Sequence, residues 1–304
     1  DMNIISVRNL HKTYNKGKTQ ALKGVDFDVR QGEIFGLIGP DGAGKTTLFR
    51  ILTTLLLPDS GTAQVDGYDV VKKYKDIRRH IGYMPGRFSL YQDMTVEENL
   101  AFFATVFNTT IQENYHLVED IYKQIEPFKH RRAGKLSGGM KQKLALSCAL
   151  IHAPHVLFLD EPTTGVDPVS RKEFWEMLQK LKTNFHLSIV VSTPYMDEAM
   201  QCDRIALMQG GEFLTIDTPQ GIINSYTDTL WTVRSDNMHR LLTDLRKTEG
   251  VKTAFAFGES HHITVDASLT FDVLRQKLID LGYQKIQIEE ITPSIEDCFM
   301  HLQN

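Results

Sequence analysis

A glycine-rich segment between an apolar run and a helical pattern carries the clearest chemistry in the chain. It fits the pattern GxxxxGK[ST] and consists of Gly39, Pro40, Asp41, Gly42, Ala43, Gly44, Lys45, Thr46 and Thr47. Glycines in this pattern allow successive backbone N–H groups to surround a phosphate, and the following helix adds its positive N-terminal end. Lys45 is expected to reach the β- and γ-phosphates, and the Thr46 hydroxyl to ligate Mg²⁺. The segment therefore predicts a site for a nucleoside triphosphate.

A pair of carboxylates follows the apolar strand pattern of residues 155–159. Successive side chains at a strand end point in different directions, so Asp160 and Glu161 can take different roles. Asp160 suits the Mg²⁺ shell, and Glu161 suits the polarisation of an attacking water. Acidic residues are common after strands, and the pair becomes a strong signal only beside the phosphate loop upstream.

A third segment, residues 136–142, reads Leu-Ser-Gly-Gly-Met-Lys-Gln at the start of a helical pattern. Alone, Ser137 with Gly138 and Gly139 would be an ordinary helix N-cap. Together with the two elements above, it resembles the ATP-binding cassette (ABC) ATPases over residues 4–218. In that family LSGGxxQ acts on the γ-phosphate held by the opposite subunit.

The resemblance implies further roles. It makes ATP and Mg²⁺ the expected ligands, and it implies a second ABC cassette as partner. Asp167, within residues 163–168, matches the D-loop at the dimer interface. Tyr14 matches the aromatic residue that stacks on adenine, although a half-buried tyrosine at a strand end is an alternative explanation.

The elements that must position these residues alternate between strands and helices. Apolar runs predict strands at 4–7, 25–29, 34–38, 156–159, 188–191 and 204–208, and periodic patterns predict helices at 45–54 and 169–181. Such alternation indicates an α/β fold with a mainly parallel sheet. The resemblance implies a P-loop NTPase cassette over residues 1–220, with an antiparallel β subdomain and a helical insertion at about 87–153.

The pattern changes after Pro219. Residues 230–233, 238–246, 251–257, 262–265, 271–281 and 285–289 follow the order β, α, β, β, α, β. This order predicts a small α+β ferredoxin-like domain over residues 221–304, with a last helix at 294–302. Residues 292–299 resemble the end of an accessory domain in ABC-2 type exporter ATPases.

Composition excludes several classes of protein. The 304 residues include 41% hydrophobic residues and carry a net charge of −4, which argues against bulk disorder and gives no basic excess for nucleic acid. The spacing of the three cysteines does not indicate a disulfide framework. No apolar stretch approaches the length of a membrane span. The first residues lack the features of a secretory signal. We expect a cytoplasmic chain held at the inner face of the cell membrane by ABC-2 type transmembrane subunits.

Two positions depart from the family pattern. After Tyr83-Met84-Pro85 the family has Gln where this chain has Gly86, and after Thr193 it has His where this chain has Pro194. The resemblance assigns the missing Gln to Mg²⁺ and water, and the missing His to the γ-phosphate. Proline offers neither a side-chain donor nor a backbone N–H. We therefore predict MgATP binding with impaired hydrolysis at this chain's own site, which favours a heterodimer over a slow homodimer.

The sequence leaves several functions open. The leading one is the ATP-binding subunit of an ABC-2 type exporter. Alternatives are a non-hydrolysing nucleotide-binding regulatory subunit and, less favoured, a soluble ABC ATPase of translation or DNA repair. Four apolar residues, Phe88, Leu90, Tyr91 and Met94, are candidates for an exposed groove that receives a membrane subunit. Local core packing explains them equally well.

Overall fold

The computed structural model describes residues 2–87 and 89–303. The chain divides into two compact units, one ending at Pro219 and the other beginning at Gln220. Phe88, one of the groove candidates, lies outside the described residues. No helix in the described part of the chain is long and apolar enough to cross a membrane.

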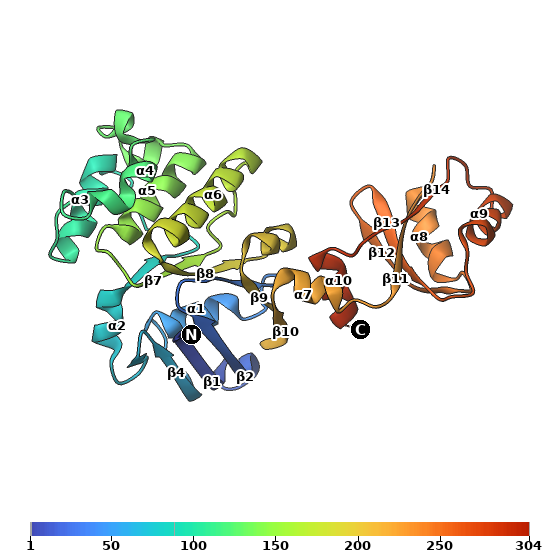
Figure 1. Cartoon of the computed structure of the whole chain (residues 1–304), viewed down its shortest axis with the longest axis horizontal. Helices are drawn as coiled ribbons and strands as arrows, with labels where there is room; N and C mark the ends of the chain where they lie inside the picture. Colours follow the sequence, from blue (N-terminus) through green and yellow to red (C-terminus); the bar gives the residue numbers. More distant parts are fainter. Residues whose placement is uncertain (1, 88, 304) are drawn as a thin grey trace. The chain divides into compact units, whose positions relative to one another are not determined.

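A six-stranded sheet forms the centre of the first unit (Figure 1). Its strands, in spatial order, are β10 (Glu212–Asp217), β9 (Arg204–Gln209), β3 (Ile34–Ile38), β8 (Ser188–Thr193), β7 (Val156–Asp160) and β6 (Ile81–Met84). All neighbours are parallel except β9 and β10. Every residue of β3, β7 and β8 is buried, which is typical of parallel strands covered on both faces. The sheet confirms the predicted α/β class.

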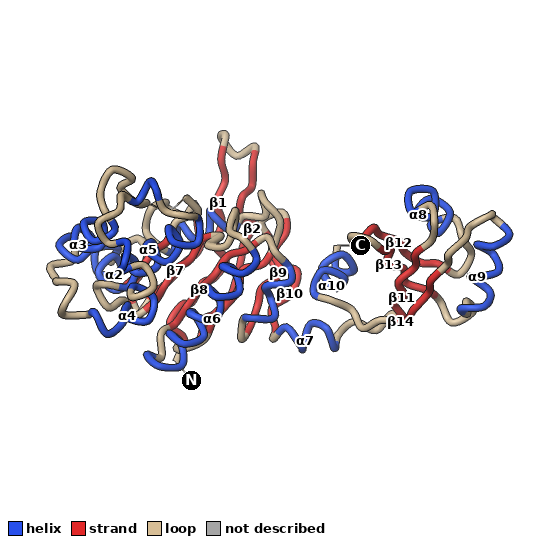
Figure 2. The backbone as a smooth tube through the Cα atoms, turned by 90° about the horizontal axis from the view of Figure 1, so that it is seen from above, coloured by secondary structure: helices blue, strands red, loops and turns tan. Residues whose placement is uncertain are grey.

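A second, antiparallel sheet packs against the first through one core. It consists of β2 (Thr19–Arg30), β1 (Asn3–Tyr14), β4 (Ser60–Val65) and β5 (Tyr68–Asp69). Phe27 of this sheet stacks on Phe35 of β3, and Phe49 of helix α1 (Lys45–Leu52) meets Phe158 of β7 edge to face. These rings join both sheets and the helix after the phosphate loop. The long β1–β2 pair can be followed in Figure 2.

Helices occupy the segment between β6 and β7, as predicted. They are α3 (Val96–Val106), α4 (Tyr115–Tyr122) and α5 (Gly138–Leu150), with short 3₁₀ turns at Glu126–Phe128 and Ala133–Lys135. Helix α3 begins with a capping box in which Thr95 and Glu98 exchange hydrogen bonds. Helix α6 (Pro168–Phe185) contacts α4 and α5, and Figure 1 shows the four helices grouped beside β7 and β8.

The second unit contains the predicted split βαβ arrangement. Its strands are β12 (Val251–Phe257), β13 (Ser260–Val265), β11 (Thr229–Arg234) and β14 (Gln287–Glu290), in that spatial order and all antiparallel. Helices α8 (Met238–Arg246) and α9 (Phe271–Asp280) share a buried core with Trp231, Val233 and Ile263 of the sheet. This topology confirms the ferredoxin-like assignment.

Two further helices complete the second unit. They are α7 (Pro219–Asn224) and α10 (Ile295–Leu302). Asp297 of α10 accepts a 2.7 Å hydrogen bond from His262 of β13, and it also accepts bonds from Ser294 in a capping arrangement. Cys298 lies 3.7 Å from the carbonyl oxygen of Ile222 in α7. The last helix is therefore fixed to both the sheet and α7.

Several elements differ from the sequence expectation. Strands β4, β5, β6 and β10, helix α2 (Tyr74–His80) and the 3₁₀ turn Met196–Gln201 were not predicted. The expected exposure was wrong at Leu90, which is only 9% exposed although it lines the apolar pocket described below, and Met94 is half-buried. Tyr91 is exposed as expected.

Candidate functional site

The phosphate loop connects β3 to α1 through backbone that only glycine adopts easily. Gly42 has φ 81° and Gly44 has φ 106°. A Cβ atom on Gly44 would lie 2.5 Å from the carbonyl oxygen of Ala21, and one on Gly39 would lie 2.2 Å from that of Met208. Both contacts are too close, so neighbouring strands enforce glycine here. The strand-loop-helix order matches the motif's requirement.

Lys45 is turned back over the loop. Its side chain is buried, and Nζ donates hydrogen bonds to the carbonyl oxygens of Gly39 and, at 3.0 Å, of Pro40. Nζ also lies 3.6 Å from Oε1 of Glu161. Burial lowers the pKa of Lys45, while the carboxylates of Glu161 and Asp41 oppose that shift. Lys45 is also part of the lining of the pocket over the loop.

The two predicted metal ligands meet at the end of β7. Thr46 Oγ1 donates a 3.3 Å hydrogen bond to Asp160 Oδ2. Ser192 on β8 donates a 2.6 Å bond to the other oxygen, Oδ1, and its hydroxyl accepts from the N–H of Glu161 at 3.0 Å. A hydroxyl and a carboxylate are the oxygen donors that Mg²⁺ prefers alongside phosphate and water. Ser192 was missed in the sequence because no motif marks it.

Glu161, the predicted base, lies beside the phosphate loop, 3.6 Å from the Lys45 ammonium. Its backbone has φ 49°, which turns the chain sharply after Asp160. Burial raises the pKa of Glu161, and the nearby Lys45 charge partly offsets that shift. A carboxylate with a raised pKa beside the phosphate loop can accept a proton from water.

A pocket of about 940 Å³ opens over the loop. Its lining includes the predicted residues Tyr14, Asp41, Gly42, Gly44, Lys45, Thr46, Thr47 and Glu161. Tyr14 Oη lies 3.2 Å from Thr47 Oγ1, which ties the ring to the start of α1. The other predicted loop residues, Gly39, Pro40 and Ala43, support the loop through their carbonyl groups.

Residues of the β1–β2 hairpin also line the pocket, including Lys18 and Lys23, together with Gly210 from the β9–β10 turn. Sequence reasoning missed them because the pairing of distant strands brings them to the loop.

Both departures from the family pattern lie near the predicted metal ligand Asp160. A Cβ atom on Gly86 would sit 3.5 Å from the carbonyl oxygen and 3.9 Å from Oδ2 of Asp160. Pro194 directly follows β8, two positions after Ser192. The structure therefore brings Gly86 and Pro194 to the same end of the sheet as Asp160 and Glu161.

The Ser-Gly-Gly segment lies on another part of the same unit. Ser137 caps α5 by accepting a 3.2 Å hydrogen bond from the N–H of Met140. A Cβ on Gly139 would lie 2.6 Å from Ser170 Oγ, and one on Gly138 would lie 3.8 Å from the carbonyl oxygen of Gly165. The segment thus packs beside the start of α6, where Asp167 is the N-cap. Among the described residues, none of this segment lines the 940 Å³ pocket.

A buried carboxylate ties the elements around the site together. Glu198, only 5% exposed, accepts hydrogen bonds from Thr163 at 2.7 Å, from Arg171 at 2.9 Å and from the Trp175 indole. It also accepts a weaker bond from Thr193 at 3.4 Å. These contacts hold α6 to the segment after Glu161. Sequence reasoning missed these contacts, because the residues are far apart along the chain.

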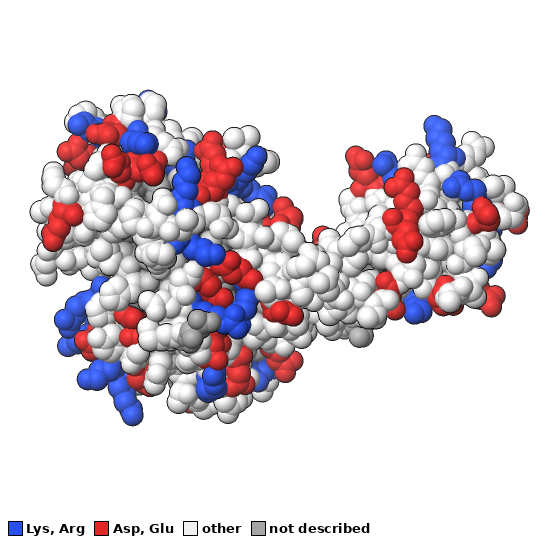
Figure 3. Space-filling model, viewed as in Figure 1, with Lys and Arg blue, Asp and Glu red and all other residues white. Residues whose placement is uncertain are grey.

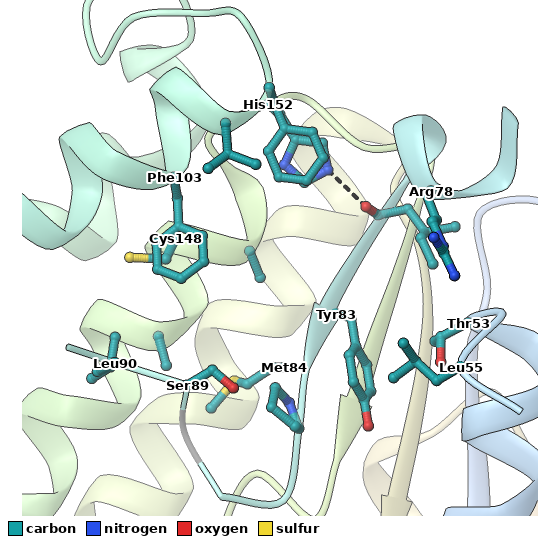
Figure 4. Close-up of a pocket in the computed structure, with 16 residues that line it drawn as sticks. Thr53, Leu55, Arg78, Tyr83, Met84, Ser89, Leu90, Phe103, Cys148 and His152 are labelled. Atoms are coloured by element: carbon teal, nitrogen blue, oxygen red, sulfur yellow. Dashed lines mark hydrogen bonds between the residues drawn. The ribbon is translucent and has the colours of Figure 1, made fainter. Parts of the chain in front are cut away.

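A second, mostly apolar pocket of about 390 Å³ lies between α3, α5 and β6 (Figure 4). Phe103, Leu90 and Cys148 face Tyr83 and Leu55 across it, with His152 at one end.

Two polar groups in this second pocket favour their uncharged forms. His152 Nε2 lies 2.7 Å from the carbonyl oxygen of Ile81, and burial lowers the pKa of this imidazole. Burial, with a contribution from Asp160, raises the pKa of Tyr83 to about 12. The pocket therefore presents a mostly apolar surface, and Pro85 in its lining directly precedes Gly86.

Known proteins resemble this chain in sequence and in fold. The sequence profile of the ABC transporter family matches residues 22–164. The chain is 39% identical to the probable multidrug ABC transporter ATP-binding protein YbhF of Escherichia coli K12, over 98% of this chain and 52% of that protein. It is 33% identical to the Nod factor export ATP-binding protein I of Rhizobium sp. N33, over 94% and 93% of the two chains.

The fold comparison agrees with the sequence comparison. The dimeric, post-hydrolysis structure of the ATP-binding cassette MJ0796 bound to ADP and Pi superposes with a TM-score of 0.63 and 26% identity, over 70% of this chain and 98% of that one. The chain spans about half the length of the first curated relatives it matches. Motifs, topology and relatives together place this chain in the family of ABC transporter ATP-binding proteins.

Proposed function

We propose that this chain is the ATP-binding subunit, or one ATP-binding half, of an ABC-2 type exporter. The observation that carries the proposal is the meeting of Lys45, Thr46 and Glu161 at one pocket that Tyr14 also lines, with Asp160 hydrogen-bonded to Thr46. The export role is supported by relatives described as multidrug and Nod factor export proteins.

The motif residues at the pocket are assigned roles in the binding and hydrolysis of MgATP. Tyr14 offers a ring for the base, and Lys45 with the loop N–H groups would hold the β- and γ-phosphates. Thr46 and Asp160 would hold Mg²⁺, which neutralises phosphate charge when it is bound. Glu161 is the candidate base for water, and Ser192 fixes its backbone and the Asp160 carboxylate.

Hydrolysis at this pocket is proposed to be weak. Gly86 has no side chain to reach past Asp160, and Pro194 has no donor for a γ-phosphate oxygen. Loss of one donor to a developing oxyanion lowers the rate roughly 10²- to 10³-fold. Binding is expected to suffer less, because the loop, Lys45 and Thr46 are retained.

The partner proposed for this pocket is a second cassette. The exposed Ser137 and Gly138, adjacent to the loop that carries Asp167, form a surface separate from the chain's own pocket. We expect this surface to complete the ATP site of a partner cassette that retains Gln and His. A heterodimer is favoured for that reason, and a slow homodimer is the alternative.

The apolar 390 Å³ pocket is the proposed docking site for a transmembrane subunit. Exposed Leu55 and Val106 extend its apolar lining to the surface, and Arg78 lies at its rim. An amphipathic helix fits such a groove. On the face that Figure 3 displays, acidic and basic side chains are intermixed, which does not favour nucleic acid as the partner. The chain would then work at the cytoplasmic face of a membrane.

A nucleotide-dependent regulatory clamp is the second candidate, and Gly86 and Pro194 favour it. Both candidates are tested by measuring MgATP affinity and phosphate release on the purified chain, with Lys45→Ala as the control for the pocket. Micromolar binding with turnover near background in the free chain, and turnover after addition of a partner cassette, supports the export role. Binding that never leads to turnover with any partner supports the clamp. Rapid turnover by the chain alone contradicts the assignment of Gly86 and Pro194.

A further inference from the structure

Asp41 brings a third carboxylate to the phosphate end of the nucleotide pocket. It lies in the loop itself, between Pro40 and Gly42, and its side chain is exposed on the pocket wall that also carries Lys45 and Glu161. Within the described residues Asp41 forms no ion pair.

The charged motif residues around Asp41, namely Lys45, Asp160 and Glu161, already have hydrogen-bond or ion-pair partners. Asp160 accepts hydrogen bonds from Thr46 and Ser192, and Glu161 lies 3.6 Å from the Lys45 ammonium. Lys45 also donates to two loop carbonyls. The buried ammonium of Lys45 is therefore shared among several acceptors. Lys18 and Lys23 also line the pocket, and among the described residues no ion pair joins either of them to Asp41.

The field of Asp41 reaches both groups that would meet the phosphates. Its negative charge raises the pKa of Lys45 against the effect of burial, and it adds to the rise in the pKa of Glu161 caused mainly by burial. A fixed negative charge that acts on these groups also acts on a phosphate placed between them.

We propose that Asp41 makes nucleotide binding at this pocket depend strongly on a divalent cation. The carboxylate repels the metal-free polyphosphate, whereas the magnesium complex carries less negative charge and is repelled less. Asp41 would thus be a specificity-determining residue that selects MgATP over free ATP. The inference rests on the proposed function, because it concerns the same pocket.

The test compares ATP affinities by titration calorimetry in Mg²⁺ and in EDTA. The variants are Asp41→Asn, Asp41→Ser as a second way to remove the charge, and Asp93→Asn as a control that removes an exposed carboxylate outside the pocket. Thermal unfolding of each protein checks that the loop variants fold.

We expect both Asp41 variants to bind ATP in EDTA about tenfold more tightly than the original chain, a gain of about 1.4 kcal/mol. In Mg²⁺ the gain is expected to fall below about threefold, and molar salt should reduce the gain in EDTA because the charge is exposed. Asp93→Asn should leave both affinities unchanged.

Two results would overturn the inference. One is an unchanged affinity in EDTA for both Asp41 variants. The other is an equal gain in ATP affinity in Mg²⁺ and in EDTA that salt does not alter. Such a result would show that Asp41 acts through its shape or its hydrogen bonds and not through its charge. Failure of the proposed function is distinguishable, since the original chain would then bind no ATP in Mg²⁺ either.

Discussion

Thr46 Oγ1 and Asp160 Oδ2 lie 3.3 Å apart and share a hydrogen bond, although 114 positions separate the residues along the chain. The contact joins the first turn of α1 to the end of β7. It places a hydroxyl and a carboxylate, both suitable for Mg²⁺, at the side of the loop where Lys45 is buried.

Replacing Thr46 by Ala should weaken the dependence of nucleotide binding on Mg²⁺. The loss of one metal ligand is expected to lower ATP affinity in Mg²⁺ about tenfold and to leave affinity in EDTA nearly unchanged. Titration with and without Mg²⁺ measures both values. Thr105→Ala, which removes a hydroxyl bonded only within α3, is the matched control. An equal loss in both conditions would show that Thr46 acts through the loop's fold instead.

The second unit should lose stability in acid through Asp297. Burial alone would raise the pKa of this carboxyl, but hydrogen bonds from His262 and Ser294 outweigh it and leave the pKa below its usual value. A carboxyl with a lowered folded pKa stabilises the fold above its unfolded pKa of about 4 and loses that contribution as pH falls further. We therefore expect α10 to loosen below about pH 4, and hydrogen exchange of its amides measures this.

Asp297→Asn should reproduce the acid effect at neutral pH. Removing the charge from a buried, hydrogen-bonded group typically costs about 2 kcal/mol of unfolding free energy. Asp280→Asn, an exposed change on α9, should cost little. If Asp297→Asn unfolds with the same pH profile as the original chain, another group is responsible for the acid dependence.

Much of this fold follows from local sequence, and the exceptions have a common cause. The strand at 34–38 and the helix at 45–54, which ends at Leu52 in the structure, were predicted because a fully apolar run, a glycine loop and a helical pattern follow one another there. Strand β4 was missed because its sequence, SGTAQV, buries only two side chains and depends on pairing with β1. The local sequence pattern of a strand does not reveal which distant strand it pairs with.

In the site, too, residues within motifs were predicted, and residues brought in by long-range contacts were not. Motif residues such as Lys45 and Asp160 were found from spacing, whereas Ser192 and Glu198 act through contacts made by folding. Leu90 was misjudged for a related reason, since an apolar residue beside a helix can face either the core or solvent.

Val106→Arg should separate the docking of a transmembrane subunit from nucleotide binding. Val106 is 56% exposed at the edge of the apolar 390 Å³ pocket, so a charge there would be buried by an incoming apolar helix. Co-purification with the membrane subunits should fall at least about tenfold, while MgATP affinity stays unchanged. Val71→Arg, at another half-exposed valine outside that pocket, is the control. Normal co-purification of Val106→Arg would place the docking surface elsewhere.

Restoring the two family residues should raise ATP turnover. Gly86 has space for a side chain, because a Cβ there makes ordinary contacts of 3.5 and 3.9 Å with Asp160. Gly86→Gln would extend an amide past the metal-site carboxylate, and Pro194→His would supply a donor at the end of β8. Each change is expected to raise phosphate release, by up to roughly 10²-fold for the histidine.

The alanine variants Gly86→Ala and Pro194→Ala control for simple changes in backbone freedom. They lack the amide and imidazole groups, so turnover should remain near that of the original chain. The double variant need not show the product of the two gains, because both groups act on one transition state. If Gln and His give no more turnover than the alanines, in spite of intact MgATP binding, these two positions do not limit hydrolysis. The weak step would then lie in closure against a partner cassette, which addition of a hydrolysis-competent cassette would reveal.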